Sequence, residues 1–132
     1  AVYMASGDLT VDASTVSGSG QNGGCVYGGG TSVSIAAGST LDTCTASADG
    51  GAVYMANGTL VVDGSTVSGS AVYGGCVYGD AGSVTISGGS ELSACAATAD
   101  GGAVYMASGP LTVDASAVSG SGQNGGCVYG GG

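Results

Sequence analysis

The sequence predicts an all-β chain that winds into a parallel β-helix (β-solenoid) of about five coils, which alternate between 24 and 27 residues. The first observation is a recurring Gly-Gly pair before Ala-Val or Cys-Val, which divides the chain into alternately longer and shorter intervals. The second is a two-residue alternation of apolar and polar side chains inside each interval, as in Val33-Ser34-Ile35, whereas no segment has a helical period. Coils of this kind bury their apolar faces only against neighbouring coils. The pairs are Gly23-Gly24, Gly50-Gly51, Gly74-Gly75, Gly101-Gly102 and Gly125-Gly126.

Two unequal coils form the true repeat, which is 51 residues long and is nested in a longer one. Residues 1–30 match residues 103–132, an offset of 102, except for Asp8 against Pro110 and Thr15 against Ala117. We therefore expect residues 1–132 to form a single β-solenoid segment that was cut from a longer repeat array.

Three short strands are expected in each coil, separated by turns of small residues. Each strand would pair with the strand one coil away at about 4.8 Å, so five coils would make a rod roughly 25 Å long. Like side chains then form inward columns of mainly branched aliphatic residues, which a buried pleated face favours. The paired glycines are expected to supply corners with positive φ.

The inward columns can be assigned strand by strand. The first strand gives Val2, Val26, Val53, Val77, Val104 and Val128. The second strand gives Leu9, Val33, Leu60, Val84 and Leu111, with Val11, Ile35, Val62, Ile86 and Val113 beside them. The third strand gives Val16, Val67 and Val118, together with Cys44 and Cys95.

One tyrosine per coil follows the inward valine of the first strand. Because successive side chains of a strand alternate between its two faces, these tyrosines are expected to point outward and to form a ladder along the rod. Such a ladder can stack on sugars or contact a neighbouring rod. The alternative is that the rings only support the sheet by pairing with one another. The ladder comprises Tyr3, Tyr27, Tyr54, Tyr78, Tyr105 and Tyr129.

The five cysteines follow the same 51-residue period in two columns, Cys25, Cys76 and Cys127 in one and Cys44 and Cys95 in the other. Members of one column lie two coils apart, about 9.6 Å, which is too far for a disulfide. A bridge must therefore join the two columns. Pairing Cys25 with Cys44 and Cys76 with Cys95 leaves Cys127 alone, whereas pairing Cys44 with Cys76 and Cys95 with Cys127 leaves Cys25 alone. Disulfides are expected in an extracellular chain, and buried free thiols are the alternative.

The charge of the chain excludes several functions, because it has nine acidic residues and no Lys, Arg or His. Without cations, nucleic acid and anionic membrane surfaces are poor partners, and no apolar run is long enough for membrane insertion. A zinc site is not expected without His or Cys-x-x-Cys. Asp12, Asp63 and Asp114 repeat every 51 residues, which is typical of solvated turns and unlike a unique active site. We therefore expect no enzyme activity, catalytic residue, metal or cofactor.

Asn57-Gly58-Thr59 is an N-glycosylation sequence on a predicted turn, which makes Asn57 a candidate glycan acceptor. The stretch 18–23 fits the dinucleotide pattern Gly-x-Gly-x-x-Gly, but it precedes a strand and does not open a helix. We therefore consider that match accidental.

The Gly-Gly-Ala-Val motif at residues 50–53 and 101–104, and its Gly-Gly-Cys-Val variant at 23–26, 74–77 and 125–128, span the whole chain. The motif resembles the Gly-Gly-Ala-(Ile/Leu/Val) repeats of right-handed parallel β-helix proteins of bacterial surfaces, including adhesins and the chlamydial polymorphic outer-membrane proteins. The resemblance implies a right-handed coil and an extracellular or cell-surface location.

These observations together predict a structural protein. We expect it to form the shaft of an extracellular fibre, filament or cell-surface appendage by end-to-end stacking of coils, with copies of itself as partners. The alternative function is an adhesin stalk whose lateral Tyr and Asp ladders bind a glycan or receptor.

Overall fold

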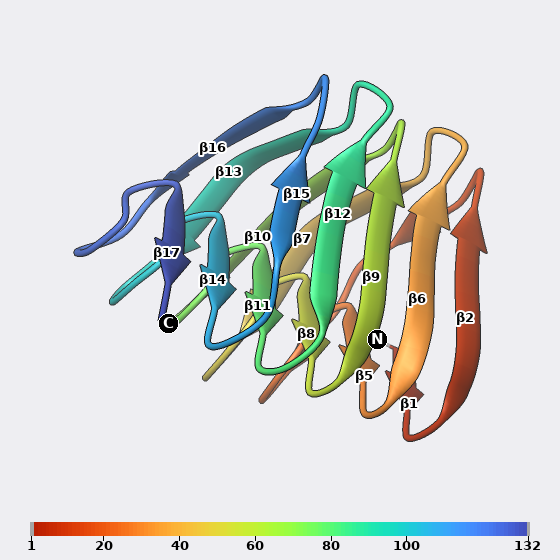
Figure 1. Ribbon diagram of the computed structural model, residues 1–132, viewed down its shortest axis with the longest axis horizontal. Helices are drawn as coiled ribbons and strands as arrows, with labels where there is room; N and C mark the ends of the chain where they lie inside the picture. Colours follow the sequence, from red (N-terminus) through yellow and green to blue (C-terminus); the bar gives the residue numbers. More distant parts are fainter. Residues whose placement is uncertain (1, 132) are drawn as a thin grey trace.

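The computed structural model describes residues 2–131, which form three parallel sheets arranged around one axis. Figure 1 shows the coils following one another along the long axis, from β2 at one end to β16 and β17 at the other. These residues contain no helix, and so none that is long and apolar enough to cross a membrane. The predicted fold class is confirmed, as a β-solenoid of about five turns that agrees with a right-handed parallel β-helix.

Each internal coil contributes one strand to each sheet, whereas the first coil contributes two short strands, β3 and β4, to the third sheet. The sheets also differ in strand length. The Val-Tyr sheet contains β1 (Val2–Met4), β5 (Val26–Gly28), β8 (Val53–Met55), β11 (Val77–Gly79), β14 (Val104–Met106) and β17 (Val128–Gly130). The second sheet contains β2 (Gly7–Asp12), β6 (Thr31–Ala36), β9 (Gly58–Asp63), β12 (Ser83–Ser87) and β15 (Leu111–Val113). The third sheet contains β3 (Thr15–Val16), β4 (Ser19–Gly20), β7 (Thr40–Ala46), β10 (Thr66–Ala71), β13 (Glu91–Ala97) and β16 (Ala117–Ser121).

The register of the sheets confirms the alternation of short and long coils. Val2 pairs with Val26 across a short coil, and Val26 pairs with Val53 across a long one. In the second sheet, Leu9 pairs with Val33 and Val33 with Leu60, as predicted. The inward columns of these two sheets are therefore those expected from the sequence, and their members in β5, β6, β8, β9, β11 and β12 are at most 1% exposed.

The predicted column of the third sheet is wrong in one respect. Val67 pairs with Leu41 and Leu92, so these leucines occupy the places that we assigned to Cys44 and Cys95. Both cysteines instead pair with Gly69. The cause is one extra residue in β7 and in β13, which shifts the register after the leucine. Thr43 and Ala94 lie in these bulges with positive φ, 54° and 51°.

Register also shows where the long coil carries its three additional residues. From Ala36 to Thr40 there are three residues in the long coil, against two from Asp63 to Thr66 in the short coil. The second additional residue is the bulge between Leu41 and Cys44, and the third precedes Asp49, which pairs with Tyr73. One residue is thus added at each of three places, and the strands remain paired.

The two glycines of each Gly-Gly pair have different roles, which corrects the expectation that both supply positive φ. Gly74 has φ of 60°, as the turn requires, whereas Gly75 has ordinary φ but lies against the next coil. A Cβ on Gly75 would lie 2.5 Å from the Ala96 nitrogen and closer still to the Gly102 carbonyl oxygen. At Gly126, in the last coil, the same Cβ would meet nothing within 4 Å.

A column of buried serines, which we did not predict, closes the corner between the second and third sheets. Ser39 and Ser90 are at most 1% exposed. The Ser39 hydroxyl donates to the Ala36 carbonyl at 2.6 Å and lies 3.1 Å from the Val11 carbonyl of the preceding coil. Ser90 repeats both contacts with Ser87 and Val62. A buried hydroxyl needs such partners, so these serines link successive coils.

Candidate functional site

The six tyrosines predicted to form a ladder do form one continuous stack on the Val-Tyr sheet. Consecutive ring centroids are 4.7 to 5.1 Å apart, and the ring planes differ by 5° to 13°. The strand register causes the stack, since Tyr27 pairs with Tyr54 and Tyr78 pairs with both Tyr54 and Tyr105. Parallel strands in register repeat the ring at the strand spacing, which lies within the range of favourable aromatic contacts.

Stacking at this distance limits what the ladder can bind. Each internal ring has its two faces covered by its neighbours, so only ring edges and hydroxyl groups reach the surface. Tyr27, Tyr54, Tyr78 and Tyr105 are accordingly only partly exposed, whereas Tyr3 at the end of the stack is 71% exposed. Sugars stack on ring faces, and the internal rings offer none. The geometry therefore favours mutual support of the rings along the side of the rod.

Tyr73 is a seventh tyrosine, which we did not single out from the sequence because its Val72-Tyr73 pair precedes a Gly-Gly pair and does not follow one. Its ring contacts Tyr105 edge-on, with centroids 5.5 Å apart and planes at 65°. Tyr73 pairs with Asp49 at the corner beside the ladder, and Asn124 pairs with Asp100 at the equivalent place two coils further on. The sequence signal for Tyr73 was therefore a tyrosine before a Gly-Gly pair, at the position where the other copy of the repeat has Asn124.

Carboxylates lie beside the middle of the ladder. Burial, with a smaller contribution from the negative charge of Asp80, raises the pKa of Asp49 above its usual value. Burial also raises the pKa of Tyr54, and it raises the pKa of Tyr78 to about 12, with Asp49 and Asp80 adding to both effects. Burial and the neighbouring Tyr129, Asp100, Tyr73 and Asp49 raise the pKa of Tyr105. These three phenol groups therefore ionise at higher pH than an ordinary tyrosine.

We expect the raised pKa of Tyr78 to destabilise the folded chain at alkaline pH. Tyr78 keeps its proton in the folded chain until about pH 12, whereas in the unfolded chain it ionises near its ordinary pKa of 10.0. The unfolded chain then binds fewer protons, so the free energy of unfolding should fall as pH rises from about 10 to about 12. Thermal unfolding across this range checks the prediction. Tyr78→Phe should reduce the fall, and an equally steep fall in that variant would contradict it.

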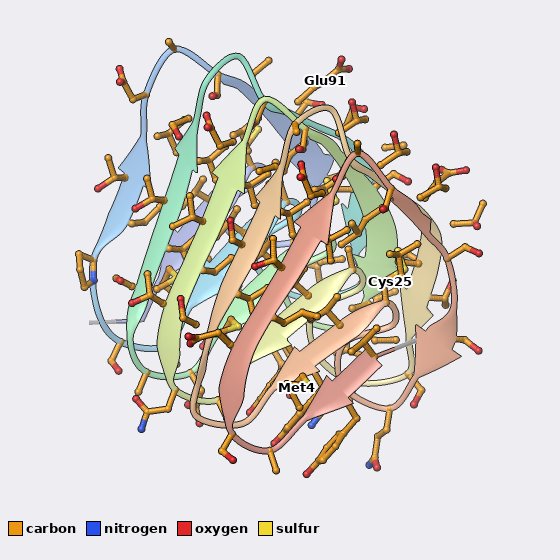
Figure 2. All side chains as sticks on the ribbon, turned by 90° about the vertical axis from the view of Figure 1, so that its right-hand side faces the viewer. Met4, Cys25 and Glu91 are labelled. Atoms are coloured by element: carbon orange, nitrogen blue, oxygen red, sulfur yellow. A yellow bond between two sulfur atoms is a disulfide. The ribbon has the colours of Figure 1, made fainter. Side chains whose placement is uncertain are left out.

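The cysteines adopt the first of the two predicted registers. Cys25 is bonded to Cys44 and Cys76 to Cys95, each across 19 residues, with Cα atoms 5.3 and 5.2 Å apart. All four residues are at most 3% exposed, whereas Cys127 is a free, exposed cysteine. Figure 2, which looks along the rod, labels Cys25 inside the coils, whereas Glu91 lies on the outside. Each bridge lies within one long coil and links the residue before its first strand to its third strand.

The C-terminal end of the rod leaves uncovered the columns that are buried elsewhere. Val128 is 39% exposed, whereas the four members of its column in β5, β8, β11 and β14 are fully buried. Val113 is 43% exposed, against at most 6% for the other four members of its column. Gly126 and Cys127 lie on the same end, and their counterparts in the preceding coils are buried. We call these four residues the C-terminal face.

The remaining candidates from the sequence are dispersed. No group of three or more His, Cys, Asp or Glu side chains in residues 2–131 is placed to hold a metal ion. Asp12, Asp63 and Asp114 are exposed, and so is Asn57, whose side-chain oxygen accepts a hydrogen bond from the Gly58 amide at 3.1 Å. Asn57 lies between β8 and β9, on the predicted turn.

A hollow of about 310 Å³ lies at the N-terminal end of the ladder. Tyr3 and Tyr27 line one part of it, and the corner that contains Gln21 and Asn22 lines the other. The Asn22 Oδ1 atom is buried there without a hydrogen-bond partner. An open aromatic ring therefore lies beside amide groups in this hollow.

Comparison of the chain with protein-family models, with curated proteins and with solved structures gives no match. The two disulfides indicate a non-cytoplasmic, oxidising location.

Proposed function

We propose that the protein is a non-enzymatic structural protein, the shaft of an extracellular filament or cell-surface appendage in which coils stack end to end. The observation that carries the proposal is the C-terminal face. Its valines occupy columns that are buried in every preceding coil from β5 onward. In the internal coils, glycine is required at this position because the covering coil leaves no room for a Cβ. Gly126 has the same residue type although no coil covers it.

The partner that fits this face is a further coil of the same kind, and a second copy of the chain can supply one. The edge strands β15, β16 and β17 have one paired neighbour each within the chain, so their other edges present free backbone donors and acceptors. A coil of the same pattern would provide hydrogen bonds to these groups and apolar contacts to Val113 and Val128. At the other end, Val2, Leu9 and Val16 are partly exposed and offer a matching surface.

Gly126→Ala tests the proposal, because the added methyl group meets nothing within 4 Å in the single chain. In the internal coils the same methyl group would collide with the covering coil, as described for Gly75. We expect the unchanged chain to form rods that lengthen with concentration, by sedimentation velocity and electron microscopy. The variant should fold normally and remain at the size of one chain.

Ser47→Ala is the matched control, because Ser47 is exposed on an internal coil and away from both ends. It should assemble as the unchanged chain does. If Gly126→Ala formed rods as long as those of the unchanged chain, the C-terminal face would not be covered by another copy. An unchanged chain that stays single at every concentration would contradict end-to-end stacking itself.

The hollow beside Tyr3 favours a second candidate function, an adhesin that binds a glycan. An open ring face and two amide side chains are the groups that proteins use to hold sugars. Oligosaccharide titration by nuclear magnetic resonance tests this, with Tyr3→Ala expected to lose binding. Tyr105→Ala is the control, because Tyr105 is the copy of Tyr3 in residues 103–132 but has Tyr73 against its ring. Equal losses in both variants would contradict a site at Tyr3.

A further inference from the structure

We propose that the tyrosine ladder conducts oxidising equivalents along the rod. A tyrosyl radical formed on one ring by a one-electron oxidant, such as a ferryl haem or an oxidised metal complex, would move from ring to ring. This activity is independent of end-to-end stacking, since all six rings belong to one chain.

The geometry that carries the proposal is the unbroken series of ring contacts. Five successive steps connect Tyr3 to Tyr129, and no step exceeds 5.1 Å between centroids. Electron tunnelling weakens steeply with distance, so transfer between stacked rings is much faster than transfer across the whole rod in one step. The inner side of the same sheet carries the valine column, which is not redox-active, and the buried methionines Met55 and Met106. Each methionine pairs with a glycine on both neighbouring strands, so the methionines form no continuous series. The ladder is thus the conducting path on this sheet.

Each step of the transfer balances. The oxidant takes one electron from a neutral phenol, whose O–H bond breaks and whose proton leaves, so that a neutral tyrosyl radical remains. The next ring then gives one electron to that radical and releases its own proton, and the first oxygen regains a proton and becomes a phenol again. In net terms, one electron and one proton have passed from the second ring to the first, and no other bond has changed.

The surroundings of the ladder supply the proton acceptors. The hydroxyl edges lie on the outer side of the sheet, where the rings are partly exposed and water can take up a proton. Asp49 and Asp80 lie close enough to raise the pKa of Tyr54 and Tyr78. An ionised carboxylate is a better proton acceptor than water. The carboxylates therefore lie at the centre of the path.

Cys127 allows the oxidant to be placed at one end. It is the free cysteine of the described chain and is exposed, and it lies two residues before Tyr129. A ruthenium tris-bipyridine complex can be attached to its thiol and oxidised by a light flash in the presence of a sacrificial electron acceptor. The ruthenium(III) formed would then oxidise Tyr129.

The other end carries a reporter. Replacing Tyr3 with 3-aminotyrosine introduces a phenol that is easier to oxidise and whose radical has its own optical and electron paramagnetic resonance spectra. We expect the aminotyrosyl signal to appear after the flash. In Tyr54→Phe/Tyr78→Phe the rings still stack, but the path contains two rings that are not readily oxidised. We expect that variant to lose the aminotyrosyl signal while the radical at Tyr129 persists.

Tyr73→Phe is the matched control, because Tyr73 contacts the ladder edge-on and lies outside the stack. It should leave the aminotyrosyl signal unchanged. Circular dichroism and strand content should be unchanged in all variants, which separates a broken path from a broken fold. Equal aminotyrosyl signals with and without the two phenylalanines would overturn the proposal. So would a radical that decays at Tyr129 in the intact ladder without reaching position 3.

Discussion

Gly75→Ala should destabilise the protein by about 3 kcal/mol or more, although it adds only one methyl group. The methyl carbon would lie 2.5 Å from the Ala96 nitrogen and 2.6 Å from the Ala96 carbonyl carbon, and closer still to the Gly102 carbonyl oxygen. All three atoms belong to backbone, so no side-chain rotation can relieve the contact. The coils must separate, and each coil is stabilised chiefly by its neighbours. The midpoint of urea unfolding measures the effect.

Gly126→Ala is the control for that variant, since the two glycines occupy the same column and differ only in whether a coil covers them. At a concentration where chains are single, its unfolding midpoint should equal that of the unchanged protein. Neither Gly75 nor Gly126 has positive φ, so backbone conformation does not enter the comparison. If both variants unfold at the same denaturant concentration, the close approach between coils is not what requires glycine at this position.

Much of this fold could be predicted because the repeat constrains it. A period of 51 residues with two-residue alternation fixes which residues lie in register, and the Val-Tyr and second sheets follow the predicted columns throughout. The tyrosine ladder and the 19-residue disulfide spacing are consequences of the same register. These features depend only on spacing, and spacing is what the sequence displays.

The features that were missed depend on local backbone conformation. An extra residue at Thr43 lets Leu41 take the inward place assigned to Cys44, and nothing in a two-residue alternation marks which residue of β7 will bulge. The role of Gly75 depends on a backbone carbonyl of the next coil, at Gly102, and the sequence cannot reveal how closely the two approach. Tyr73 breaks the repeat, so period alone could not place it beside Tyr105.

Removing one internal disulfide, as in Cys76→Ala/Cys95→Ala, should lower the free energy of unfolding by about 3 kcal/mol. The bridge closes a loop of 19 residues, and cutting it gives the unfolded chain more conformations. Cys127→Ala is the matched control, because that cysteine is exposed and unbonded, and it should leave stability unchanged. Urea unfolding of both variants under non-reducing conditions measures the difference.

The same bridge should also resist reductants in the folded state, because Cys76 is fully buried and Cys95 is 3% exposed. Thiol titration of the native protein should find one reactive group, Cys127, and added dithiothreitol should release the others only once denaturant opens the coils. The short coil between the two bridges has Ala52 and Gly69 in the cysteine columns, and it closes with three fewer residues. The bridge therefore restrains a coil that contains three additional residues. For this reason we expect the Cys76→Ala/Cys95→Ala variant to be less stable than the unchanged protein, even though the short coil needs no bridge. Rapid reduction of the native chain, or a double alanine variant as stable as Cys127→Ala, would show that the bridges do not hold the long coils closed.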